Sequence, residues 1–115
     1  MNQRQRATIS RQLPILQHLA KCTDKDCRLF VTSLSNPVIR LIAQIAINVM
    51  NKNIAIDDPK AVRSLRRYKK QLLKITRPKT TVQQQRRVLQ QKGGFLGALL
   101  GVALPLITRA IGGLV

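Results

Sequence analysis

The sequence predicts an all-α protein: a small helical bundle, followed by an amphipathic basic helix and a Gly-rich apolar C-terminal segment. Aromatic residues, which strands favour, make up only 3% of the 115 residues. The apolar residues are mostly Leu, Ile and Ala, and they recur at steps of three and four, the period of one helix face. Because 44% of the residues are hydrophobic, the composition also argues against a disordered chain.

Residues 1–57 are expected to form a helical head, and its first two helices follow from capping residues. The first is predicted to begin at Thr8 or Ser10, because Pro14 is tolerated only in the first turn of a helix. The second is predicted to follow a cap at Thr23 or Asp24.

The third helix of the head, about residues 37–51, is expected to be the most buried. Asn36 can cap it, and Pro37 suits the first helical position. Apolar residues at steps of three and four form one broad stripe along it. This stripe consists of Val38, Leu41, Ile42, Ile45, Ala46, Val49 and Met50.

One His and two Cys in the head raise the question of a metal site. His18, Cys22 and Cys27 supply only three ligands, whereas structural zinc takes four. We therefore expect no metal and no cofactor. A disulfide between Cys22 and Cys27 remains possible in an oxidising setting, but two small, partly buried thiols are the favoured interpretation.

Residues 58–92 carry most of the positive charge. The chain has 21 Lys and Arg against four Asp, for a net charge of +17, and 12 of these basic residues lie in residues 59–92, which hold no acid. Asp57, Asp58 and Pro59 predict the start of a helix of about 18 residues, because carboxylates and Pro favour a first turn. Its apolar seam consists of Val62, Leu65, Tyr68, Leu72 and Ile75.

This unopposed charge predicts non-specific binding of nucleic-acid phosphates, because each Lys or Arg that meets a phosphate releases counterions. A further short helix, capped by Thr80 or Thr81, extends the basic region to Lys92. No zinc finger, aromatic RNA-binding pair or helix-turn-helix pattern indicates recognition of bases. The candidate nucleic-acid-binding residues are Arg63, Arg66, Arg67, Lys69, Lys70, Lys74, Arg86 and Arg87.

Residues 93–115 form an apolar tail in which Arg109 is the only charged residue. The uncharged run 93–108 is shorter than the about 20 residues that usually span a membrane, and Pro105 would kink it. Three interpretations remain: insertion into an anionic membrane, docking on a partner or a second copy, and folding back onto the head as core. The candidate anchor residues are Phe95, Leu96, Leu99, Leu100, Val102, Leu104, Leu106 and Ile107.

The order of these segments, with RSLRRYKKQL at 63–72 and QRRVLQQKGGFLG at 85–97, resembles small basic proteins of Maverick/Polinton-type elements and their adintovirus relatives. The resemblance implies a virion or host-nucleus setting and a double-stranded DNA or capsid partner, since the minor virion proteins of such viruses include DNA-condensing and membrane-active ones. The chain departs from the processing sites of this group, which place a hydrophobic residue two positions before Gly-Gly: Gln91 and Ala110 stand there instead.

The sequence thus predicts a non-enzymatic, virion-type structural protein. Its few acids, in two clusters, argue against acid–base catalysis. Non-specific binding of double-stranded DNA by the basic helix is expected, with the tail attaching to a capsid protein, an anionic membrane or another copy. The alternatives are a membrane-active protein in which residues 93–108 insert, and a capsid-cement protein. The polar N-terminus carries no signal peptide, which predicts an intracellular location.

Overall fold

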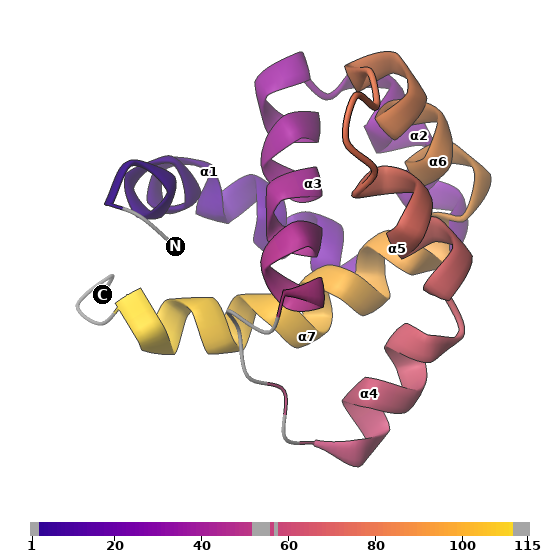
Figure 1. Ribbon diagram of the computed structural model, residues 1–115. Helices are drawn as coiled ribbons and strands as arrows, with labels where there is room; N and C mark the ends of the chain where they lie inside the picture. Colours follow the sequence, from indigo (N-terminus) through magenta and orange to yellow (C-terminus); the bar gives the residue numbers. More distant parts are fainter. Residues whose placement is uncertain (1–2, 52–55, 57, 112–115) are drawn as a thin grey trace.

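The computed structural model describes residues 3–51, 56 and 58–111, and within these ranges the chain is helical without any strand (Figure 1). The prediction of an all-α protein is confirmed. The helices are α1 (Gln3–Lys21), α2 (Asp24–Ser33), α3 (Asn36–Met50), α4 (Pro59–Arg66), α5 (Lys69–Ile75), α6 (Val82–Gln91) and α7 (Gly93–Ile111).

The apolar C-terminal segment forms α7, which runs across the middle of the molecule beneath α3 (Figure 1). It packs most extensively against α1, and also against α2, α3, α4 and α6. Of the three interpretations of this segment, the structure has the one in which it folds back onto the head. The side chains that it buries are those of Phe95, Leu96, Leu99, Leu100, Ala103, Leu104 and Ile107.

The described residues hold no single helix that is long and apolar enough to cross a membrane. Only Val82–Gln91 and Gly94–Arg109 taken together satisfy the length and composition of a span, and they are bent by 103° relative to each other.

Helix α3 buries the stripe predicted for it, except at its C-terminal end. Val49 is half-buried and Met50 is 40% exposed. The prediction that Asn36 caps the helix is wrong: Ser35 occupies the N-cap position, and Asn36 is the first helical residue. Both short polar residues suit a cap, so the sequence alone did not separate them.

The start of α1 differs from the expectation. The helix begins at Gln3 rather than at Thr8 or Ser10, and Pro14 lies well inside it. Pro removes one backbone hydrogen bond from a helix interior. Ile9 and Leu16, on either side of Pro14, are both buried in the core, and this tertiary packing keeps the helix continuous across the proline.

The predicted single basic helix is two helices, α4 and α5, separated by a turn at Arg67 and Tyr68. The ring of Tyr68 packs against Phe95 of α7, with 5.8 Å between the ring centroids. The contact lies at the bend, and Leu65 before it and Leu72 after it are both buried. Tertiary packing therefore overrides the helical period of the sequence.

Three predicted caps are confirmed. The Thr23 hydroxyl accepts a hydrogen bond of 3.2 Å from the Asp26 amide at the start of α2. Asp58 precedes α4, with its Oδ1 accepting a hydrogen bond of 3.0 Å from the Lys60 amide. Thr81 caps α6 in a capping box: its hydroxyl accepts from the Gln84 amide at 3.1 Å, and the Gln84 side chain accepts from the Thr81 amide at 2.9 Å. Asp57, which was expected to assist at α4, lies outside the described residues.

Both cysteines are free thiols, with Cys22 half-buried and Cys27 fully buried. Burial, followed by the neighbouring Cys22, raises the pKa of the Cys27 thiol to about 12, which keeps it protonated and unreactive at neutral pH. No group of three or more metal-ligating side chains gathers anywhere in the described part of the chain.

Candidate nucleic-acid interface

A cationic surface covers α4, α5 and the turn between α5 and α6. On α5, Leu72 and Ile75 point into the core, so the opposite side of this helix faces solvent. Lys70 and Lys74 lie one turn apart on that side. All six basic residues that the sequence indicated on the predicted helix are exposed: Arg63, Arg66, Arg67, Lys69, Lys70 and Lys74.

The surface is hollowed where α4 meets α5. This corner hollow has a volume of about 490 Å³ and is lined by Arg66, Arg67, Tyr68, Lys69, Lys70, Gln71 and Lys92. Lys92, which was not among the predicted nucleic-acid-binding residues, comes from the end of α6 and adds a fifth cation. None of the acids that the structure describes lines the hollow, so its lining side chains carry a net positive charge.

The start of α7 holds this corner together. The Gly94 amide donates a hydrogen bond of 2.6 Å to Oδ1 of Asp24, which ties α7 to the start of α2. A Cβ at Gly94 would lie 2.7 Å from the Tyr68 hydroxyl oxygen, so any larger residue here would displace the Tyr68 side chain. Because Lys92 directly precedes α7, the same contacts bring it to the corner hollow. The other carboxylate oxygen of Asp24 pairs with Arg28 at 3.0 Å.

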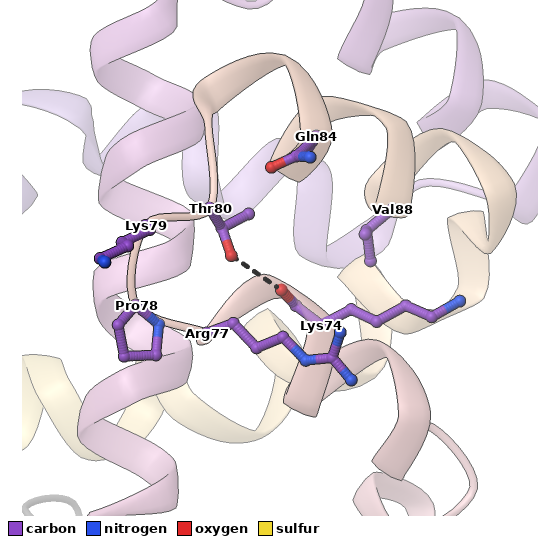
Figure 2. A pocket seen from close by; sticks show the side chains of 7 residues that line it. All are labelled: Lys74, Arg77, Pro78, Lys79, Thr80, Gln84 and Val88. Atoms are coloured by element: carbon purple, nitrogen blue, oxygen red, sulfur yellow. Dashed lines mark hydrogen bonds between the residues drawn. The ribbon is translucent and has the colours of Figure 1, made fainter.

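A second hollow, of about 360 Å³, lies at the turn between α5 and α6 (Figure 2). We call it the turn hollow. Lys74 is the only candidate from the sequence that lines it, and Arg77 and Lys79 add two cations that the sequence analysis missed. A basic-Pro-basic turn between two basic helices was the available signal. The remaining lining residues are Pro78, Thr80, Gln84 and Val88.

Arg86 does not belong to this surface. It is half-buried, and its guanidinium donates 2.6 Å to the Val31 carbonyl and 2.8 Å to Oδ1 of Asn36. It thereby joins α6 to the end of α2 and the start of α3, where a cation also complements the helix C-terminus. Its neighbour Arg87 is exposed and lines neither hollow.

This difference between neighbours predicts opposite outcomes for matched substitutions. Arg86→Ala is expected to lower the free energy of unfolding by about 1–3 kcal/mol, because it leaves the Val31 carbonyl without its charged donor. Arg87→Ala, which removes the same charge, is expected to change it by less than about 0.5 kcal/mol. Urea denaturation of both variants measures the difference. Equal midpoints for the two would contradict the clamping role of Arg86.

Most of the candidate anchor residues of the tail are buried in the core. Six of them are in the core, and Val102 and Leu106 are half-buried. The six core residues are Phe95, Leu96, Leu99, Leu100, Leu104 and Ile107. Contact of these six with a membrane or a partner therefore requires α7 to leave the bundle.

No protein-family model matches this chain, and no curated protein or solved structure matches it either. The resemblance to proteins of Maverick/Polinton-type elements therefore stays a prediction.

Proposed function

We propose that this protein binds nucleic acid non-specifically, through the cationic face made by α4, α5 and the α5–α6 turn. The observation that carries the proposal is the corner hollow, which brings together five cations from three segments of the chain, with no acid among its lining residues. Helices α4 and α5 and the end of α6 supply these side chains, which are exposed and free to reach phosphate oxygens. No enzymatic step is part of the proposal.

The arrangement favours contact with the backbone over recognition of bases. Helix α5 has seven residues and is about 10 Å long, which matches the rise of roughly three nucleotides of one strand. Lys70 near its start and Lys74 near its end can therefore meet different phosphates. Tyr68, the single aromatic residue of this face, packs against Phe95 of the core rather than presenting a stacking platform.

Double-stranded DNA is the partner we propose, and a virion or host nucleus the setting, on the strength of the resemblance in segment order. Attachment to a capsid protein, an anionic membrane or another copy belongs to the same proposal only if α7 can leave the bundle. The buried state of α7 makes the DNA-binding role the one that the geometry supports best. Membrane activity and capsid cementing remain the alternatives.

Titration of a fluorescent random-sequence DNA duplex with the full chain, at 50–300 mM NaCl, tests the proposal. The logarithm of the observed binding constant is expected to fall linearly with the logarithm of the salt concentration, with a slope of about −4 to −6 for five to seven phosphate contacts. A second duplex of unrelated sequence should bind equally well. A flat slope, or a strong preference for one sequence, would contradict non-specific phosphate binding.

A further inference from the structure

We propose that the turn hollow is a discrete site for a phosphate group. Its geometry is independent of the corner hollow, and only the nucleic-acid source of the phosphate rests on the proposed function. A backbone phosphate and free inorganic phosphate present the same oxyanion to the site. Three features of the turn support the assignment: its cations, the engagement of its carbonyl groups, and its defined shape.

The cations come from the end of α5 and from the turn itself. Figure 2 shows the side chains of Lys74 and Arg77 extending toward the same side of the turn, while that of Lys79 extends the opposite way. We therefore assign direct contact with the phosphate to Lys74 and Arg77, and a longer-range contribution to Lys79. A planar guanidinium beside an ammonium is a favourable pair for an oxyanion, because Arg donates two parallel hydrogen bonds.

Carbonyl groups at a turn would normally repel an anion, but several carbonyl groups of this turn already accept hydrogen bonds from the protein. Thr80 bonds to two of them: its hydroxyl donates to the Lys74 carbonyl at 3.4 Å, and its amide donates to the Arg77 carbonyl at 3.3 Å. The carbonyl of Thr80 itself accepts 3.1 Å from the guanidinium of Arg40, on α3. These bonds pair three carbonyl oxygens with donors, which reduces their repulsion of an anion and leaves the positive side chains to dominate the local potential.

The turn also has a defined shape before any ligand arrives. Pro78 restricts its own φ, and Lys79 adopts a left-handed φ of 67°, which is unfavourable for a residue with a Cβ. The hydrogen bond from Arg40 joins this conformation to the buried helix α3. A preordered turn loses less conformational entropy when Arg77 and Lys74 close on an anion.

Two of the amides at the start of α6 are already engaged in hydrogen bonds. Those of Thr81 and Gln84 are already bonded within the capping box. We assign anion binding here to the side chains, and substitution of these exposed side chains should weaken it while leaving the fold intact.

Titration of the full-length ¹⁵N-labelled protein with inorganic phosphate, at constant ionic strength set by NaCl, tests the site. We expect saturable shifts centred on the amides of Lys79 and Thr80. The double variant Lys74→Gln/Arg77→Gln should raise the apparent Kd for inorganic phosphate at least fivefold. A matched double variant, Lys21→Gln/Lys25→Gln, removes the same charge from exposed positions of the head and should stay within twofold of the parent. Shifts that never saturate, or equal weakening in both variants, would overturn the site.

A parallel titration with duplex DNA separates this inference from the proposed function. Saturation by inorganic phosphate without any duplex binding by the parent would leave the site standing as one for free phosphate, and would refute the proposed function. Salt-dependent duplex binding without saturation by inorganic phosphate would support the proposed function and would refute the phosphate site at the turn. If both hold, Arg66→Gln/Arg67→Gln should weaken duplex binding yet leave inorganic phosphate affinity at the turn within twofold.

Discussion

Substitution of four corner cations by Gln is expected to weaken duplex-DNA binding about 100-fold at 100 mM salt and to lower the log–log salt slope by about three to four. The four are Arg66, Arg67, Lys69 and Lys70. The physical reason is that each phosphate no longer contacted by the protein keeps about 0.9 of a condensed counterion on the DNA, so fewer ions are released on binding. All four side chains are exposed, so the free energy of unfolding should change little. Fluorescence anisotropy across the salt series measures both quantities.

A matched variant separates local from total charge. Neutralising four exposed cations of the head also lowers the net charge by four, without touching α4, α5 or their turn. This control consists of Arg4→Gln, Arg11→Gln, Lys21→Gln and Lys25→Gln. It should keep most of the affinity and change the slope by less than about one. Equal losses in the two variants would mean that binding depends on the whole +17 charge rather than on the corner hollow.

Leu99→Ala is expected to lower the free energy of unfolding by about 3–4 kcal/mol, because Leu99 is fully buried in the helix that contacts most of the others. Domains of this size have total stabilities of about 5–15 kcal/mol, so the loss should be plain in a urea titration. Val102→Ala, on the same helix but half-buried, should cost only about 1 kcal/mol.

The same comparison addresses the role of the apolar segment. A large difference between the Leu99 and Val102 variants is expected if α7 is core in solution. Small and nearly equal changes in the free energy of unfolding would indicate that α7 is mostly outside the bundle in solution. That result would favour attachment to a membrane, a capsid protein or another copy.

Several local signals were predicted well because they act over a few residues, although the cap of α3 and the start of α1 were not. The cap at Asp58 needs only its neighbour Lys60, and the capping box of α6 needs only Thr81 and Gln84. Exposure of the basic residues on α4 and α5 followed from helical period and charge alone. The break at Tyr68 could not be predicted in this way, because its cause is the ring of Phe95, which lies in another helix.

The candidate interface was predictable in part for the same reason. The cations of α4 and α5 are adjacent in sequence, so their shared surface was expected. Lys92 joins them through the Gly94–Asp24 hydrogen bond, which links residues 70 positions apart. Arg86 was expected at the interface, but its guanidinium instead donates to the Val31 carbonyl, 55 positions away in the sequence. Neither contact has a periodic signature in the chain.

By itself, the sequence determined that the chain is helical, that its charge is concentrated in residues 59–92, and that residues 93–108 must be covered. Helical period and composition decide which face of a segment is buried, since these properties are local. Only the tertiary structure decided what covers that face. Burial of α7 depends on contacts with α1, α2 and α3, and hydrophobic free energy, being non-directional, does not distinguish these partners from a membrane or another protein.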